Sequence, residues 1–433
     1  MIWNPDAECA DLKTMRQHQL ESLRKLVDIV YAKVPFYKKK FEDAAVRPDD
    51  IKNLEDIQKL PFTTKSDLRE TYPYSLVSAP LDEIVEVHAS SGTTGTPVVD
   101  AYTENDINIW SDAMARTLSM AGTTHRDVVQ NAYGYGLFTG GLGVHYGTRR
   151  IGAQIIPISA GNTQRQIAVM RDFGSSILTC TPSYSLFLAE AAKDMGIDFR
   201  NLKLKAGCFG AEPWSNNMRD EIEEKLNLSA HDIYGLTEII GPGVASECEI
   251  KNGLHINEDY FYPEVINSET GEVLPDGEKG ELVFTTLTRT GTPLIRYRTR
   301  DITYLFREKC GCGRTLIKMH RLFGRNDDMM IIRGVNVFPS QIEDVLVKIE
   351  GTEPHYQIIL SRGDSHLDEI EIQVEVEESF FSDETRKMEE LRNKISETVK
   401  SKLGISAIIK LVEPRTISRS EGKAKRVIDK RII

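Results

Sequence analysis

The sequence predicts an α/β fold in two domains, a large one followed by a small one. Between residues 85 and 220, short apolar runs alternate with helical patterns, which is the rhythm of parallel strand–helix units. From about residue 245 the pattern changes to strands and turns that favour an antiparallel barrel or sheet. Beyond residues 325–330, helices and strands alternate in a compact α+β unit of roughly a hundred residues.

Composition bounds the class of protein. The chain has 433 residues, too many for one ordinary domain, and its 40% hydrophobic and 27% charged content is typical of a globular protein. A net charge of -11 argues against general binding to nucleic acid or to an anionic membrane surface. No apolar run is long enough to span a bilayer, and the first residues do not have the pattern of a signal peptide. Six cysteines are too few for a disulfide scaffold, so a reducing cytoplasm is expected.

The large domain begins with an amphipathic helix over residues 10–33, which Pro35 is expected to end. Apolar runs that predict the following strands lie at 84–87, 151–158, 176–180 and 204–209. Loops at the carboxyl ends of parallel strands carry function, and we expect segments 90–97 and 210–213 to be two of them. After a turn at 276–280, residues 281–287 predict a strand of the antiparallel region.

The small domain is predicted to contain helices at 340–348 and 383–403 and strands at 356–360, 370–376 and 408–412. In the second strand, apolar and polar residues alternate, which indicates one buried face. Glu375, Glu377 and Glu378 are expected on a solvated face of this domain.

The segment Ser90-Ser91-Gly92-Thr93-Thr94-Gly95-Thr96-Pro97 has the composition of a phosphate-binding loop. Small residues let backbone N–H groups approach an anion, and the hydroxyls add donors. A P-loop would place a lysine after its last glycine, but none follows Gly95, so the cation must come from elsewhere. Lys423, in Arg419-Ser420-Glu421-Gly422-Lys423, is the candidate; its alternative role is a solvated lysine in a basic tail.

Further segments follow in order along the chain: Tyr133–Gly141, Gly210–Pro213, Tyr234-Gly235-Leu236-Thr237-Glu238, Tyr297–Asp301, Gly324–Asp328, Ile331–Ser340 and Arg419–Arg431. Together with Ser90–Pro97 they resemble the adenylate-forming superfamily of acyl-CoA synthetases, luciferases and peptide-synthetase adenylation domains, and in detail the phenylacetate–CoA ligase family. Each motif alone is weak, whereas their order and spacing are specific, and the resemblance covers essentially the whole chain.

The resemblance implies a domain at 1–326, with two βα sheet subdomains and a β-barrel-like subdomain, that binds ATP or AMP and the acid. A mobile α+β domain at 327–433 would carry Lys423. The implied enzyme is an AMP-forming ligase for an aryl acid such as phenylacetate, with ATP, Mg²⁺ and CoA. The acid and ATP would give an acyl-adenylate and pyrophosphate, and the CoA thiol would then give the thioester and AMP.

Roles for single residues follow from the resemblance and from charge. Lys423 and Glu238 are the catalytic candidates: Lys423 because a cation is needed where two anions meet, and Glu238 because a carboxylate near the triphosphate needs a cation between them. Glu238 and Thr94 are the Mg²⁺ candidates, although Thr237 or Glu238 could instead cap a helix. Asp301 and Arg325 are placed at the ribose or phosphate, the alternative being a surface ion pair. The full nucleotide set is Ser90, Ser91, Gly92, Thr93, Thr94, Gly95, Gly210, Ala211, Glu212, Pro213, Tyr234, Gly235, Thr237, Asp301 and Arg325.

The acid pocket is expected at Tyr133, Tyr135, Phe138, Gly140 and Gly141, because glycines open space beside flat aromatic walls. The alternative is an aromatic pair in the core. Thr139 interrupts a dinucleotide-binding glycine pattern at this point. By the resemblance, Asp327 is the hinge and the Gly334 loop approaches CoA.

Two pairs of residues whose side chains can bind a metal lie in the predicted antiparallel region. Cys248 with His255 and Cys310 with Cys312 would supply three thiolates and one imidazole, a donor set for structural Zn²⁺. The alternative is four unconnected residues, with Cys248 buried as a small hydrophobe.

Two other functions share the same motifs. One is an adenylate-forming transferase whose acceptor is an amine, a hydroxyl or a reduced deazaflavin instead of CoA. The other is a nucleotide-binding regulatory protein without catalysis, against which the intact Lys423, Glu238 and Asp301 argue. A homodimer is the expected assembly.

Overall fold

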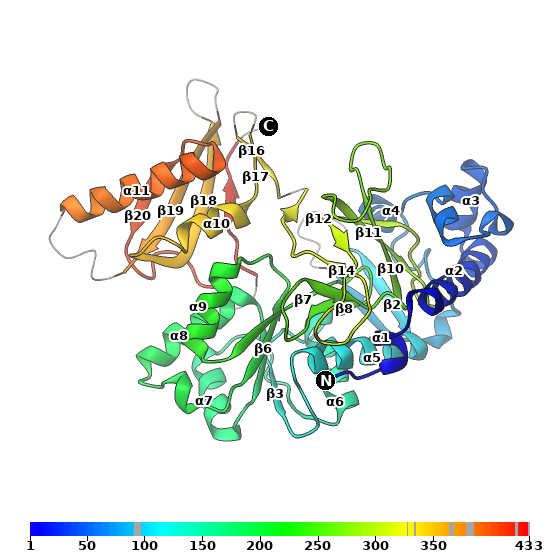
Figure 1. Ribbon diagram of the computed structural model, residues 1–433, viewed down its shortest axis with the longest axis horizontal. Helices are drawn as coiled ribbons and strands as arrows, with labels where there is room; N and C mark the ends of the chain where they lie inside the picture. The colour runs from blue at the N-terminus through cyan, green and yellow to red at the C-terminus, as the bar shows by residue number, and fades with distance from the viewer. Residues whose placement is uncertain are drawn as a thin grey trace.

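The computed structural model describes residues 1–90, 97–326, 328–332, 335–362, 368–377, 385–420 and 423–431. Figure 1 shows a large N-terminal part and a small C-terminal part that lies over α8 (Pro182–Asp194) and α9 (Asn216–Leu226). No helix of the described residues is long and apolar enough to cross a membrane.

Within the described residues, nine strands form one mixed sheet at the centre of the N-terminal part. In order across the sheet they are β13 (Leu305–Phe306), β14 (Lys318–Met319), β9 (Leu254–Ile256), β8 (Gly241–Glu247), β7 (Ser229–Leu236), β6 (Ala206–Gly210), β5 (Ile177–Cys180), β3 (Val128–Asn131) and β4 (Gln154–Ile156). Strands β7, β6, β5, β3 and β4 run parallel, whereas β8, β9, β14 and β13 continue the sheet in antiparallel pairs. The parallel rhythm is thus confirmed.

Helices cover both faces of the parallel strands, which explains why these strands are apolar on both sides. Helices α7 (Thr163–Phe173), α8 and α9 lie on one face, and α5 (Glu104–Met120) and α6 (Thr139–Ile151) on the other (Figure 1). Along β5, Leu178 and Cys180 pack with the first group, whereas Ile177 packs with the second.

One predicted strand pairs differently from the expectation. The run at 84–87 belongs to β1 (Ile84–Ala89), which pairs antiparallel with β2 (Val99–Thr103) in a separate two-stranded sheet. The prediction that segment 90–97 follows a parallel strand was therefore wrong, because the segment joins the two strands of an antiparallel pair. The run at 151–158 also begins too early, since Ile151 ends α6.

A second, antiparallel sheet of the described chain consists of β10 (Phe261–Ile266), β11 (Gly280–Thr286), β12 (Tyr297–Thr303) and β15 (Gly324–Arg325). Helices before it are α1 (Pro5–Glu8), α2 (Leu12–Lys33), α3 (Pro35–Asp43) and α4 (Lys65–Glu70), with 3₁₀ turns at Pro48–Asp50, Leu54–Lys59, Leu81–Glu83 and, later, Phe199–Asn201. The predicted helix at 10–33 is α2. Pro35 ends it and also begins α3, a first position that tolerates proline.

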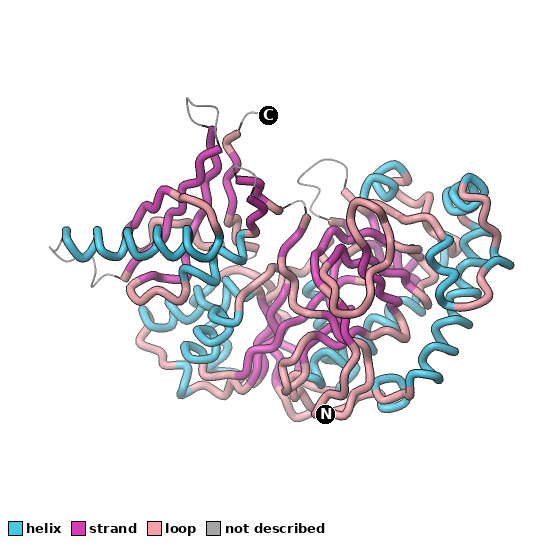
Figure 2. The backbone as a smooth tube through the Cα atoms, turned by 45° about the horizontal axis from the view of Figure 1, so that its top comes forward, coloured by secondary structure: helices cyan, strands magenta, loops and turns pink. Residues whose placement is uncertain are grey.

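The C-terminal part has its own core. The hairpin of β16 (Met330–Ile332) and β17 (Val335–Val337) leads into α10 (Pro339–Leu346), and α11 (Thr385–Leu403) follows later. Its sheet has the order β20 (Ile408–Val412), β19 (Asp368–Val376), β18 (Thr352–Arg362) and β21 (Val427–Asp429), and Figure 2 shows these strands apart from those of the N-terminal part. The apolar residues from Met330 onward pack as a separate cluster. The expected hinge, Asp327, lies outside the described residues.

Two features of this part were not predicted. Strand β21 lies in the basic tail and pairs parallel with β18, although its sequence carries no strand pattern. The expectation that Glu375 is solvated was wrong: its side chain is fully buried on β19 and accepts hydrogen bonds from Arg419 and from backbone N–H groups. Glu377 is exposed as expected, and Glu378 lies outside the described residues.

Candidate active site

The candidate site lies where strands β6 and β7 end at the same edge of the large sheet. Segment Gly210–Pro213 begins on the last residue of β6, and Tyr234 and Gly235 lie near the end of β7. A Cβ at Gly210 would lie 2.2 Å from the Ile233 carbonyl oxygen, and one at Gly235 would lie 2.0 Å from the Gly241 oxygen. Both positions therefore require glycine for backbone packing alone, whatever ligand binds. Ala211, next in the chain, has a left-handed φ of 71°, a conformation that is costly for a non-glycine residue.

Tyr234 and Asp301 meet although they come from different sheets. The Tyr234 hydroxyl donates to Asp301 Oδ2 over 2.6 Å, and Arg325 Nε lies 3.7 Å from Asp301 Oδ1. Residues 299–301 oppose Leu282 alone, between the pairs Val283–Arg298 and Glu281–Ile302, and this bulge sets the position of Asp301. Burial and the Asp301 carboxylate raise the pKa of Tyr234 well above its ordinary value. The structure thus brings together three predicted nucleotide residues, with Tyr234 as a hydrogen-bond donor.

Glu238 follows β7 and is buried with a cation beside it. Lys65 Nζ, at the start of α4, lies 3.4 Å from Glu238 Oε1. Burial raises the pKa of Tyr297 well above its ordinary value, and the Glu238 carboxylate beside it adds to that shift. Thr237 lies in the turn after β7. Thr94, the other Mg²⁺ candidate, lies outside the described residues, so the structure leaves that pair untested.

The loop that carries Lys423 reaches the segment after β6. The backbone N–H of Ala424 donates to Glu212 Oε2 over 3.1 Å, while Glu212 Oε1 accepts from the Ser183 N–H of α8 over 2.7 Å. Ser420 Oγ donates to the Lys423 carbonyl oxygen over 2.9 Å, and the Lys423 side chain is exposed. Residues more than two hundred positions apart in sequence are therefore in direct contact.

The predicted acid-pocket loop is organised by Asn131, at the end of β3. Its side-chain amide donates to Tyr135 Oη over 2.9 Å and to the Gly141 carbonyl oxygen over 2.7 Å. His145 Nδ1 lies 3.3 Å from the same Tyr135 oxygen. Burial raises the pKa of Tyr133 well above its ordinary value, and the Gly210 backbone near the Tyr133 hydroxyl lowers that pKa by a smaller amount. This loop therefore adjoins the segment after β6.

Not every predicted pocket residue is enclosed. Phe138 is 52% exposed at the start of α6, so it does not form a buried wall in this structure. Gly140 packs on Tyr133, and a Cβ at Gly141 would lie 2.6 Å from the Gly134 oxygen. The Ser90 Oγ accepts a hydrogen bond from the Val98 N–H over 3.0 Å, so this contact joins the two ends of the predicted phosphate-binding segment. Ser91, Gly92, Thr93, Gly95 and Gly334 lie outside the described residues.

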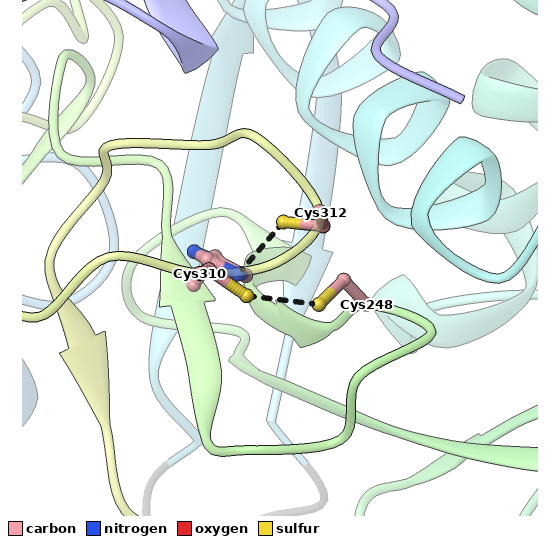
Figure 3. A group of neighbouring side chains, drawn as sticks. Cys248, Cys310 and Cys312 are labelled. Atoms are coloured by element: carbon pink, nitrogen blue, oxygen red, sulfur yellow. Dashed lines mark hydrogen bonds between the residues drawn. The ribbon is translucent and has the colours of Figure 1, made fainter.

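The four predicted zinc ligands converge on one point. The ligand atoms of Cys248, His255, Cys310 and Cys312 all lie within 4.8 Å of one another, and Figure 3 shows the three cysteines facing a common centre. Sulfur atoms of Cys248 and Cys310 are 3.6 Å apart, and Cys312 Sγ is 3.5 Å from His255 Nε2. A tetrahedral zinc with its usual bond lengths needs separations of about 3.8 and 3.6 Å for these two kinds of pair. The four residues are therefore neighbours and not unconnected, although Cys248 is buried in an apolar cluster, as the alternative expected.

Two residues of this region were missed from the sequence. Lys65 follows an ordinary helix-capping Thr64, and Asn131 ends a buried strand, so neither is marked by a motif. Only their three-dimensional neighbours, Glu238 and Tyr135, indicate a role.

Comparisons with known proteins agree with this geometry. Residues 9–288 match the AMP-binding enzyme family, and residues 334–431 match the AMP-binding enzyme C-terminal domain. A phenylacetate-coenzyme A ligase of Pseudomonas putida is 49% identical over 428 residues, which are 98% of this chain and 96% of that protein. A 2-hydroxyisobutyryl-CoA ligase crystallised in the postadenylation state has a TM-score of 0.94 and 31% identity, covering 99% of this chain and 92% of that one.

The same 2-hydroxyisobutyryl-CoA ligase in its thioesterification state, with CoA, matches with a TM-score of 0.74 at 32% identity and the same coverage. Because sequence and coverage barely change, the lower score reflects a different arrangement of the two parts. The two parts of this structure are therefore arranged more like those of the relative crystallised in its postadenylation state than like those of its thioesterification state. Motifs, fold and relatives agree over nearly the whole length: the chain belongs to the phenylacetate–coenzyme A ligase family of AMP-binding enzymes.

Proposed function

We propose that this protein is an ATP-dependent, AMP-forming ligase that joins an aryl acid, with phenylacetate first, to CoA. In the first step, a carboxylate oxygen of the acid attacks the α-phosphorus of ATP and pyrophosphate leaves. In the second, the CoA sulfur attacks the carbonyl carbon of the acyl-adenylate, AMP leaves with its oxygen, and the thiol proton is released.

One observation carries this proposal. The backbone next to Lys423 is hydrogen-bonded to Glu212, so the C-terminal loop is held at the edge where β6 and β7 end. That edge is where ligands bind in parallel α/β sheets. A lysine brought there from a separate part suits a reaction in which two anions must approach each other. The phenylacetate ligase of Pseudomonas putida supports the choice of acid.

The remaining residues have roles that follow from their chemistry. Lys423 would stabilise the charge that develops at the α-phosphate, and Asp301 would accept hydrogen bonds from the ribose hydroxyls with Arg325 beside it. Tyr234 would orient the Asp301 carboxylate through their 2.6 Å hydrogen bond. Tyr133 and Tyr135 offer aromatic surface for the ring of the acid.

Mg²⁺ fits the chemistry of Glu238. This ion prefers carboxylate and phosphate oxygens, and Glu238 offers a carboxylate beside the cationic Lys65. Bound there with Thr94, the ion would neutralise part of the triphosphate charge. Glu238 would hold the ion, and Lys65 would add a second positive charge for the leaving pyrophosphate.

The decisive assay is pyrophosphate release with a panel of carboxylic acids, each with and without CoA. We expect release with phenylacetate or a close relative, and formation of thioester and AMP only when CoA is present. Adenylate that never passes to CoA would refute the ligase and favour another acceptor. No release with any acid would favour the regulatory alternative.

Lys423→Ala tests the assignment of the lysine. We expect loss of adenylate formation, while thioester formation from supplied acyl-adenylate is largely kept. Lys425→Ala is the matched control, because that lysine is also exposed and lies two positions away. Equal loss in both half-reactions would contradict the role given to Lys423.

We further propose that Cys248, His255, Cys310 and Cys312 hold a structural Zn²⁺. The ion would join three segments: the residue after β8, strand β9, and the turn between β13 and β14. This turn also contacts the N-terminus, because Arg314 donates to the Met1 carbonyl oxygen over 2.6 Å. Elemental analysis of protein purified without added metal should find about one zinc per chain, and a strong chelator should lower the melting temperature. Stoichiometry near zero in folded protein would remove the site.

We also propose a homodimer and a cytoplasmic location. Light scattering of the purified protein tests the homodimer.

A further inference from the structure

The loop that carries Lys423 is held against the N-terminal part at two points, one on each side of the lysine. On one side, Ala424 N–H donates to Glu212. On the other, Arg419 reaches Glu190 of α8, with Nε 3.1 Å from Oε2 and Nη2 3.1 Å from Oε1. Both contacts involve carboxylates at α8. Glu190 belongs to this helix, and Glu212 accepts a hydrogen bond from the N–H of Ser183 in the first turn of the helix.

Arg419 has a second partner that moves with it. Its Nη1 and Nη2 donate to the two oxygens of Glu375 over 2.8 and 2.9 Å, and Glu375 is fully buried in the C-terminal part. Glu375 also accepts from the Arg415 and Ile417 N–H groups, which fixes the tail that leads to Lys423. The guanidinium is therefore already paired within its own domain. Its contact with Glu190 is an addition that exists only while the two parts are docked.

Glu190 has a further partner across the same boundary. His355 of β18 donates from Nε2 to Glu190 Oε1, and the His355 side chain is buried. Burial alone would raise the pKa of Glu190, but the hydrogen bond from His355 and the charge of Arg419 hold that pKa below its ordinary value. Glu190 is thus an ionised carboxylate that binds two groups of the C-terminal part at once.

We propose that Glu190, acting through Arg419, is the positioning residue that seats Lys423 for adenylate formation and that the contact must break before the thioester step. This inference rests on the proposed ligase function. The ligase relative was crystallised in a postadenylation and in a thioesterification state, and this structure resembles the first more, with a TM-score of 0.94 against 0.74. A contact that is lost between the two arrangements would affect one half-reaction and not the other.

Glu190 is a cleaner position to test than Arg419. Replacing Arg419 would leave Glu375 fully buried without its cation, and the C-terminal part itself would be destabilised. Replacing Glu190 leaves Arg419 paired with Glu375. Asp194, one helical turn further along α8, supplies a matched control because it pairs with Arg415 across the same boundary, with side chains 54% and 65% exposed. Exposed pairs of this kind contribute little.

The experiment measures both half-reactions and domain arrangement in Glu190→Ala, Glu190→Gln and Asp194→Asn. For Glu190→Ala we expect the kcat of adenylate formation to fall about 10- to 100-fold, as misplacement of a catalytic group by about 1 Å does. Its thioester formation from supplied acyl-adenylate and CoA should be unchanged or faster. Glu190→Gln should lose less, because the amide oxygen still accepts from Arg419, and Asp194→Asn should match the wild type.

Equal loss in both half-reactions, or normal adenylate formation in Glu190→Ala, would overturn the proposal. Small-angle X-ray scattering of the unliganded proteins gives a readout that does not depend on the reaction. Glu190→Ala should have a larger radius of gyration than Asp194→Asn, and equal radii would count against the contact. If the wild type activates no acid, the proposed function fails, while scattering still tests whether Glu190 holds the two parts together.

Discussion

Replacing Tyr234 by phenylalanine removes one hydroxyl from the contact between β7 and β12. That hydroxyl donates to Asp301 Oδ2 over 2.6 Å, and the two residues are only 7% and 6% exposed. A buried hydrogen bond to a charged acceptor contributes about 1.5–3 kcal/mol, so we expect Tyr234→Phe to lower the free energy of unfolding by about 2 kcal/mol. Arg325 remains 3.7 Å from the other carboxylate oxygen, so Asp301 keeps a cationic neighbour and the fold should persist.

The functional consequence is specific to ATP. If Asp301 binds the ribose, a carboxylate that has lost its orienting donor should raise the KM for ATP about tenfold, equivalent to about 1.4 kcal/mol, with kcat little changed. Tyr260→Phe is the control, because Tyr260 Oη also donates to a carboxylate, Asp112 Oδ2, over 3.0 Å. It should cost stability and leave the KM for ATP unchanged. If Tyr234→Phe lost stability but bound ATP normally, Asp301 would have no role at the ribose.

Two further predictions concern stability. Burial lowers the pKa of His231 to about 4 from 6.5. Between these pH values the folded state therefore binds fewer protons than the unfolded state. The neutral imidazole contributes its full share to the free energy of unfolding above pH 6.5, and about 3 kcal/mol of that free energy is lost as the pH falls to 4. Urea unfolding should show a shallower loss over this range for His231→Gln, and identical slopes would refute the assignment. Gly210→Ala would place a Cβ 2.2 Å from the Ile233 carbonyl oxygen, so we expect about 1–3 kcal/mol of destabilisation by chemical unfolding; unchanged stability would mean that the strands shift apart freely.

Sequence reasoning succeeded where a local pattern determines the outcome. Helix α2, the parallel strands and the alternating strand β19 each follow from the spacing of apolar residues. It failed where partners are remote. The run at 84–87, which lies in β1, was interpreted as the start of a parallel unit because pairing direction leaves no mark on a short apolar run. Glu375 was expected at the surface because its acceptance of Arg419, 44 positions away, is invisible in sequence.

The candidate site divides in the same way. Cys248, His255, Cys310 and Cys312 could be named because thiol and imidazole groups are rare and chemically distinctive. The contact between Tyr234 and Asp301 could not, since each residue type is common and has a structural role elsewhere in this chain. Lys65 and Glu190 were missed for a further reason: their importance derives from facing Glu238 and Arg419, not from any motif around them.

The strength of the contacts between the two parts suits a protein that must change their arrangement. Carboxylates of α8 and its neighbouring loop receive Arg419, Arg415 and the Ala424 N–H, and most of these groups are partly exposed. The exposed Arg415–Asp194 pair contributes about 0–1 kcal/mol, and the more buried Arg419–Glu190 pair contributes more. Because a shift between two arrangements needs only a few kcal/mol of differential binding, loss of pyrophosphate and arrival of CoA would suffice to exchange them. In the role proposed for Lys423, a docking surface made of charged hydrogen bonds would allow it to enter the site for one step and to leave it for the next.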